Sequence, residues 1–519
     1  MKAKKNKFIR LIIWIVSAVL LLMAITPLLF TNLASEKIKE LANRNLNGEL
    51  DYKSARLSFF SHFPSLTLSL YEFQLYGSPP FEKDTLLAAN EIAFGLNLRS
   101  LFTKKMVIDH VYFSNSFINI KVNKKGEPNY AIYTGSADTS QQASSANESQ
   151  LKIEAITIKH SKLVYDDQSL PMLIMAKDFN YKGQGDLTQA IFDLKTHVEI
   201  GSLDFSFDNT AYVIDKKINA DLVTRVNTES LALLFEQNNI KINKLPLEFK
   251  GSFEFLKNGY GLDFTINSVH AQLEDLLSLL PPDFKQWTES SKMKGAVDLN
   301  FTLKGNYQPE EQQMPGVSLY LKVENALIDY PKAPDAINNL NCTFKAMIPG
   351  LNPDSLQIDL DTLYCSLGND HFASSLHLIG LNEPNLRTKI KVNADIEKWC
   401  TAFDIQQFTA KGLFSVDLNA NGQIKHGPKA GSLRNDTVLI QIPRFALKTQ
   451  FSKGYFKFAE LPEPLQNAGF ELSAECVDGN PSNLKFDFKN FNINFIKNYA
   501  AGFLSINGLS EPEIKSDFN

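Results

Sequence analysis

The sequence predicts a mainly β protein in which an N-terminal transmembrane helix is followed by an elongated, repetitive antiparallel β-sheet with short interspersed helices. Three features lead to this prediction: one uncharged apolar segment, many segments that alternate apolar and polar residues, and phrases that recur at fixed separations. The chain has 519 residues, enough for two to four ordinary domains. Its net charge of −4, without a basic run after the first ten residues, excludes nucleic acid as an expected partner.

The apolar segment is Leu11–Phe30, which has 20 residues and no charge. As a helix it is long enough to cross a bilayer core of roughly 30 Å. A positive flank precedes it and should stay in the cytoplasm; its residues are Lys2, Lys4, Lys5, Lys7 and Arg10. We therefore expect a cytoplasmic tail at 1–10, a single-pass anchor at 11–30 and the rest of the chain across the membrane. A cleaved signal peptide is the alternative, although "TNLAS" is a poor cleavage site.

Strands are expected to begin after a short amphipathic helix in "SEKIKELANRNL". In "SLTLSLYEFQL", Leu66, Leu68 and Leu70 share one face and Phe73 continues one residue out of phase, which indicates a β-bulge near Leu70. Such alternation predicts a sheet with one apolar and one polar face. The residues that we expect on the apolar face are Leu66, Leu68, Leu70, Phe94, Leu96, Leu98, Val297, Leu299, Phe301, Leu303, Phe414, Val416 and Leu418.

Residues 134–150, "TGSADTSQQASSANESQ", predict a flexible linker or long loop. Related phrases stand on both sides of it, and at a sequence offset of 45 (153 − 108) Ile108 aligns with Ile153 and Phe113 with Ile158. The linker is therefore expected to interrupt one continuing sheet. The expected domains are an N-terminal module at 31–133, the linker at 134–150, a β segment at 151–268 and two repeat units at 269–391 and 392–519.

A second repeat, which we call the long repeat, relates "GLNEPNLRTKIKVN" from Gly380 to "GLSEPEIKSDFN" from Gly508, a sequence offset of 128 (508 − 380). The phrases "RVNTESLALLF", "SVHAQLEDLLSLL" and "KVNADIEKWCTAF" predict helical turns, each followed by a Lys-Gly pair that should open a strand: Lys250–Gly251, Lys294–Gly295 and Lys411–Gly412. Stacked strand sets of this kind predict an elongated body. At Asn519 the chain either ends on an open sheet edge or is the front part of a longer protein, and we expect the second.

Several segments of residues 1–133 together carry a family likeness: the anchor, "RNLNGELDYKSARLSFFSHFPSLTLSLYEFQLYG", "DTLLAANEIAFGLNLRSLFTKKMVIDHVYFSNSFINIKV" and the turn "NKKGEPNY". In these segments the chain resembles the AsmA-like family of double-membraned bacteria. The resemblance implies an inner-membrane anchor, a periplasmic body and a curved, taco-like β-groove with an apolar concave face, allied to the bridge-like lipid transfer proteins. It also implies a part in phospholipid transport to the outer membrane and in envelope integrity.

Two architectures explain the alternation: paired sheets that bury each other's faces, or one sheet whose apolar face is covered by acyl chains. With the resemblance we expect the groove, with phospholipids held by the apolar-face residues named above. The alternative function is a membrane-tethered periplasmic scaffold or chaperone for outer-membrane proteins, whose strand edges pair with client strands. An outer-membrane or other envelope protein is a further expected partner.

Motifs for catalysis are weak, so we expect no enzyme, no metal and no cofactor. Ser291–Lys294 spells S-x-x-K, a pattern of some acyl-transferring enzymes. When the Lys-Gly pairs are aligned, Lys294 matches Lys411 but Ser291 matches Phe408, and no further motif partner is present. His371 and His377 could share a strand face, yet a third metal ligand is missing nearby in the sequence.

The four cysteines are far apart in the sequence: Cys342, Cys365, Cys400 and Cys476. A disulfide between Cys342 and Cys365 is conceivable outside the cytoplasm. Their counterparts in the long repeat are Phe470 and Ile493, so these positions favour an apolar side chain. We therefore expect free thiols that pack as small hydrophobic groups.

Overall fold

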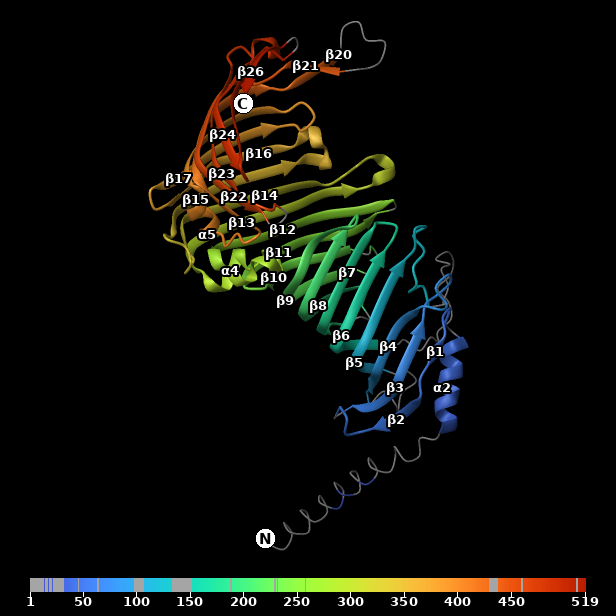
Figure 1. The fold of residues 1–519 in the computed structure, drawn as a ribbon. Helices are drawn as coiled ribbons and strands as arrows, with labels where there is room; N and C mark the ends of the chain where they lie inside the picture. Colours follow the sequence, from blue (N-terminus) through green and yellow to red (C-terminus); the bar gives the residue numbers. More distant parts are fainter. Residues whose placement is uncertain are drawn as a thin grey trace, which may run out of the picture. The chain divides into compact units, whose positions relative to one another are not determined.

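The computed structural model describes residues 32–44, 46–62, 65–97, 107–132, 152–186, 189–227, 232–256, 258–428, 437–458, 461–509 and 512–519, with Trp14, Ser17, Leu21 and Ser230 besides (Figure 1). The expected membrane span, Leu11–Phe30, lies outside the described residues except at three positions. Within the described ranges, no helix has both the length and the apolar character needed to cross a bilayer. The chain divides into two compact units, Met1–Asn243 and Lys244–Asn519, which we call unit 1 and unit 2.

In its described residues, unit 1 consists of one helix followed by a β-sheet. Its elements are α2 (Asn32–Arg44), β1 (Leu50–Asp51), β2 (Ser54–Ser58), β3 (Leu66–Tyr76), β4 (Thr85–Leu96), β5 (Val107–Val122), β6 (Lys152–Asp167), β7 (Met172–Gln184), β8 (Ile191–Phe207), β9 (Thr210–Asn227) and β10 (Ala232–Ile242). Both β1 and β2 pair with β3, and from β3 to β10 each strand pairs with the next. The prediction of a mainly β chain is confirmed here.

The one parallel pair of strands described in unit 1 is β5 with β6. Ile108 lies opposite Ile153 and Phe113 opposite Ile158, so the two phrases that align across the linker are ladder partners. The prediction that the linker interrupts one continuing sheet is confirmed. The prediction of an entirely antiparallel sheet is wrong at this pair, because the long connection between the strands allows the chain to return and run in the same direction.

Unit 2 is a meander of strands with three short α-helices among its described residues. Its strands are β11 (Leu245–Leu256), β12 (Gly259–Gln272), β13 (Lys292–Tyr307), β14 (Gly316–Asp329), β15 (Ile337–Ile348), β16 (Gln357–Leu367), β17 (Asp370–Ile379), β18 (Asn385–Asp395), β19 (Phe408–Gln423), β20 (Lys425–Pro428), β21 (Thr437–Gln441), β22 (Arg444–Phe458), β23 (Leu465–Cys476), β24 (Lys485–Phe495), β25 (Asn498–Asn507) and β26 (Glu513–Phe518). Its α-helices are α3 (Leu273–Leu277), α4 (Lys285–Ser290) and α5 (Ile396–Ala402). Pairing is antiparallel from β11 to β19 and on through β22 to β26, while β20 and β21 form a separate two-stranded sheet.

The long repeat recurs in the backbone of unit 2. Strand β15 begins at Ile337 and β23 at Leu465, which is the same offset as in the sequence, and β16 and β17 match β24 and β25 in the same way. Asn352 and Asn480 both cap a 3-10 turn by accepting a bond from the backbone two residues ahead. The β20–β21 hairpin is an insertion, because the chain between Gly422 and Pro443 is longer than that between their counterparts, Gly305 and Pro315.

Two expectations about local structure are wrong. The Lys-Gly pairs do not open strands: Gly295 lies inside β13 with φ of 137°, where the register shifts. A Cβ there would lie 2.5 Å from the Cβ of Ala326, so glycine permits the two strands to approach. The phrase from Arg225 to Phe235 is not helical in its described part, because it ends β9 and begins β10. Its apolar residues pack along a strand rather than on a helix face.

The change of phase in β3 is real but differs from the expected one-strand bulge. Glu72 has a left-handed backbone conformation with φ of 51°, which shifts the alternation of side chains by one residue. Leu70 and Phe73 therefore both face the same core cluster. Leu70 pairs with Ile92 and Phe73 with Ala89, an unchanged register. The alternation of side chains in β4 must therefore also shift by one residue opposite Glu72, and the pairing of the two strands continues without a register change.

Further bulges are stabilised by a side chain from the neighbouring strand. At His270, with φ of 54°, the backbone N–H donates to Asp298 Oδ1 at 2.8 Å, and the N–H of Asn325 donates to Asn341 Oδ1 at 2.9 Å. In unit 1 the N–H of His160 donates to Asn180 Oδ1 at 2.9 Å. Each bulge leaves a ladder N–H unpaired, and the Asn or Asp side chain restores its bond while the strand bends.

Candidate functional site

Unit 2 carries a continuous apolar face, built because apolar residues fall in the same phase on successive strands. Leu299 of β13 lies opposite Leu321 of β14, which lies opposite Phe344 of β15; Phe344 lies opposite Leu360 of β16, and Leu360 opposite Leu376 of β17. On β19, Val416 and Leu418 continue this face and lie opposite Val392 and Ile390 of β18, while Phe414 lies opposite Phe451 of β22. The face therefore presents mostly apolar side chains from strand to strand, interrupted by Thr388 opposite Leu376 and by Thr449 opposite Val416.

Much of this face stays partly exposed. Leu299, Phe301 and Leu303 are half-buried although a paired strand flanks them on each side. Between two packed sheets, such central side chains would be fully buried, as in the core of a β-sandwich. Among the described residues nothing covers these three side chains completely, so the face is open at this level.

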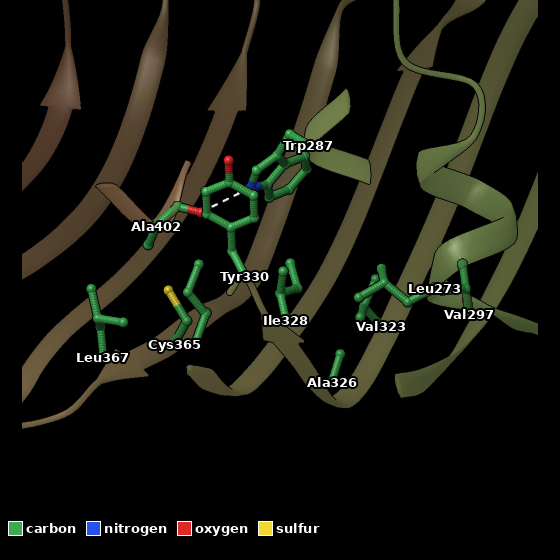
Figure 2. Close-up of a cluster of buried hydrophobic side chains, with 11 residues drawn as sticks. Leu273, Trp287, Val297, Val323, Ala326, Ile328, Tyr330, Cys365, Leu367 and Ala402 are labelled. Carbon is green, nitrogen blue, oxygen red and sulfur yellow. Dashed lines mark hydrogen bonds between the residues drawn. The ribbon is translucent and has the colours of Figure 1, made fainter. Parts of the chain in front are cut away.

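Helices cover the other part of the face. Trp287 of α4 and Ala402 of α5 meet above it, where Trp287 Nε1 donates to the Ala402 carbonyl at 2.8 Å (Figure 2). We call α3, α4 and α5 the clasp. Leu273, Trp287 and Ala402 of the clasp form one buried cluster with residues of the sheet and its connections beneath it: Val297, Val323, Ala326, Ile328, Tyr330, Ile337, Cys365 and Leu367. Val297 is therefore 0% exposed, whereas Leu299 on the same strand face is open.

The clasp is expected to contribute strongly to the stability of unit 2. Trp287→Ala removes a buried ring and leaves the Ala402 carbonyl without its donor, so unfolding should become easier by about 3–5 kcal/mol. Phe284→Ala is the matched control, because Phe284 precedes the same helix but is 45% exposed, and its effect should stay below about 1 kcal/mol. Chemical denaturation measures both variants. Equal midpoints for the two would contradict a structural role for the clasp.

In unit 1 the expected apolar-face residues are less accessible. Leu66 and Leu70 are 5% and 4% exposed, and Leu68, Phe94 and Leu96 are half-buried. Leu70 belongs to a core cluster that also includes Tyr52 and Phe73, with Leu68, Phe94 and Leu96 packed against it. Leu98 lies outside the described residues. The open positions suited to a ligand are therefore clearest in unit 2.

The polar face of unit 2 is hollowed where β18, β19 and β22 to β24 adjoin, and charged side chains of both signs line it: Lys391, Asp417, Lys448, Glu471, Asp487 and Lys489. Lys391 Nζ lies 3.7 Å from Asp417 Oδ2. Because opposite charges adjoin, this surface does not favour a ligand of one sign, and it serves as a solvated outer face.

Titratable groups form one ring stack in unit 1. Tyr112 lies between His62, with ring centroids 3.8 Å apart, and His110, at 4.0 Å. Burial lowers the pKa of both imidazoles. The charge of Glu91 partly raises the pKa of His62, and that of Lys159 lowers it further. The pKa of His110 is lowered further by the charges of His62 and Lys182 and partly raised by that of Asp109. A histidine whose folded pKa lies below its unfolded value of about 6.5 stabilises the fold above that pH, and the stability is lost as the pH falls.

Acidification from about pH 7 to about pH 5 should therefore loosen β5 locally. His110→Gln keeps a group able to bond the Thr157 hydroxyl, which His110 Nε2 approaches at 2.7 Å, but removes one titrating ring. Hydrogen exchange of the β5 amides should accelerate less steeply with acid in this variant than in the wild type. The same acid dependence in both proteins would show that the stack is not responsible.

The weak catalytic motif has a structural explanation. Ser291 is buried at the end of α4, and its hydroxyl donates to the Trp287 carbonyl at 2.7 Å. His377 Nδ1 bonds to the Asp359 carboxylate on the neighbouring strand. In the described part of the chain no three His, Cys, Asp or Glu side chains come together to suit a metal ion.

All four cysteines are free thiols in this structure. Cys342 lies opposite Leu363 on the apolar face, and Cys365 is buried beneath the clasp. Burial raises the pKa of Cys365 to about 11 and also raises the pKa of Cys342 and Cys400. These thiols therefore stay protonated at neutral pH and act as packing groups.

Sequence reasoning found the phase of the apolar face but missed the clasp. The clasp depends on a contact between residues 115 positions apart, which no local pattern reveals. A signal was present in the two tryptophans, Trp287 and Trp399, because a large ring on a short helix needs a surface on which to pack.

Residues 2–244 of the chain match the model of the AsmA family. The match covers nearly the whole of unit 1 and ends where unit 2 begins. No curated protein matches the chain. No solved structure matches it either.

Proposed function

Through residues 2–244 this chain belongs to the AsmA family, and from this premise we propose that it binds lipids by their acyl chains along the apolar face and passes them through the cell envelope. The observation that carries the proposal is the exposure of Leu299, Phe301 and Leu303 on an otherwise well-paired sheet. Such a face is stabilised by an apolar partner, and each buried methylene of an acyl chain contributes about 0.8 kcal/mol.

Transfer needs no covalent chemistry in this proposal. Side chains of the same kind recur on strands about 4.8 Å apart, so a chain can move between sites of similar affinity. The long repeat extends the series over its second copy. The protein is then a non-enzymatic carrier that requires no cofactor or metal.

The proposed setting is the bacterial inner membrane, with residues 11–30 as a single-pass anchor, the N-terminus in the cytoplasm and the remaining chain in the periplasm. Phospholipids are the proposed cargo and the outer membrane their destination, with an outer-membrane or other envelope protein as acceptor. Family membership supports a role in the envelope, and the positive flank before residue 11 supports the orientation.

A binding experiment tests the proposal with the purified full chain. A fluorescent phospholipid should bind saturably and be displaced by unlabelled phospholipid but not by its water-soluble headgroup. Lack of saturable binding by the folded protein would reject it. Recovery of client proteins without lipid after crosslinking in cells would instead favour the scaffold or chaperone function.

A further inference from the structure

The two copies of the long repeat in unit 2 differ in the side chains of their apolar face. At five partly exposed positions an aliphatic or thiol group in the first copy is replaced by phenylalanine in the second. The pairs are Val317 and Phe445, Cys342 and Phe470, Ile358 and Phe486, Leu360 and Phe488, and Leu363 and Phe491. The reverse change occurs at Phe344 and Phe372, whose counterparts are Leu472 and Ala500. The strands correspond between the copies, so the difference lies in the side chains.

The rings of the second copy touch one another across neighbouring strands. The centroid of Phe451 lies 5.8 Å from that of Phe470, and Phe470 lies 5.3 Å from Phe488. Phe488 and Phe491 are 5.5 Å apart on β24. We call these four residues with Phe445 and Phe486 the aromatic segment. Its rings are half-buried except Phe451, so most present an accessible surface.

The need to pack the sheet does not by itself explain the phenylalanines of the second copy. Ile358 and Leu360 occupy the matching positions of the first copy and are also half-buried, so the sheet forms there with aliphatic side chains. A phenyl ring differs from these groups because it is flat, stiff and carries a π-face. The feature that the second copy gains is therefore a row of stiff rings in contact with one another, with neighbouring ring planes tilted by 43°, 35° and 34°.

We infer that the aromatic segment favours lipids whose hydrocarbon part is flat and rigid, with conjugated double bonds or fused rings, over saturated chains. Offset stacking on a ring adds to the burial of apolar area only for a ligand with a flat π-system or flat ring surface. A rigid ligand also loses less conformational freedom on binding. This inference rests on the proposed function, because it assigns a preference to one part of the same face.

The test compares two fatty acids of equal length on the full chain: cis-parinaric acid, a conjugated tetraene whose fluorescence reports binding, and stearic acid as its saturated competitor. The double variant Phe486→Ile with Phe488→Leu carries the residues of the first copy. Its preference for the tetraene should fall by about two- to tenfold, mainly through weaker tetraene binding. The reciprocal variant, Ile358→Phe with Leu360→Phe, should gain preference.

The outcomes separate the inference from the proposed function. If both fatty acids bind and the preference is unchanged in both variants, the aromatic segment has no selective role while lipid binding stands. If the wild type binds neither fatty acid, the proposed function fails and the inference with it. Circular dichroism of each variant establishes that a lost preference does not come from unfolding.

Discussion

Phe301→Asp is expected to lower the affinity for a phospholipid by at least about tenfold while unit 2 stays folded. Phe301 is half-buried on the open part of the apolar face, so a carboxylate there reaches water when no ligand is bound. A bound acyl chain would take this water away and leave the charge without a partner. Titration with a fluorescent phospholipid measures the affinity, and a thermal scan of the same sample reports folding.

Lys304→Glu is the matched control for Phe301→Asp. Lys304 lies on the same strand but is exposed on the polar face, where it pairs with Asp263 at 2.8 Å. Its reversal of charge should leave the affinity within about twofold of the wild type, because exposed ion pairs contribute little. A folded Phe301→Asp protein that binds phospholipid as tightly as the wild type would contradict the proposed face.

Val297→Asp should have a different result, the unfolding of unit 2. Val297 is 0% exposed and lies with Leu273 of the clasp and Val323 of β14 in one buried cluster. An unpaired carboxylate in such a place costs several kcal/mol, a large fraction of the roughly 5–15 kcal/mol that stabilises a typical domain. Thermal scanning and proteolysis of the full chain measure the loss.

Val297→Ala serves as the control for size. It removes apolar contact without adding charge and should cost about 2 kcal/mol. A Val297→Asp protein with the melting temperature of the wild type would mean that this position is open to water, and that the clasp does not cover the face.

The apolar phase and the repeats could be predicted because they are local or periodic. Alternation places Leu299 and Phe301 on one face whatever lies above it. The alignment across the linker correctly matched Ile108 with Ile153, since ladder partners in a parallel pair keep one constant offset. Direction of pairing could not be predicted in this way, because an alternating strand presents the same faces to a parallel or an antiparallel neighbour.

The parts that escaped prediction depend on contacts distant in sequence. The alternation predicted the same position on the apolar face for Val297 and Phe301. The clasp buries Val297 completely, whereas Phe301 stays partly exposed. Bulges such as that at His270 depend on an acceptor, Asp298, in another strand.

Photocrosslinking in cells tests the central claim most directly. A benzophenone side chain placed at position 301 is compared with the same group at 304 on the polar face. We expect crosslinks to phospholipid at 301 and none at 304. Crosslinks at 301 to the protein alone would mean that protein covers this face, and would contradict a lipid-binding groove.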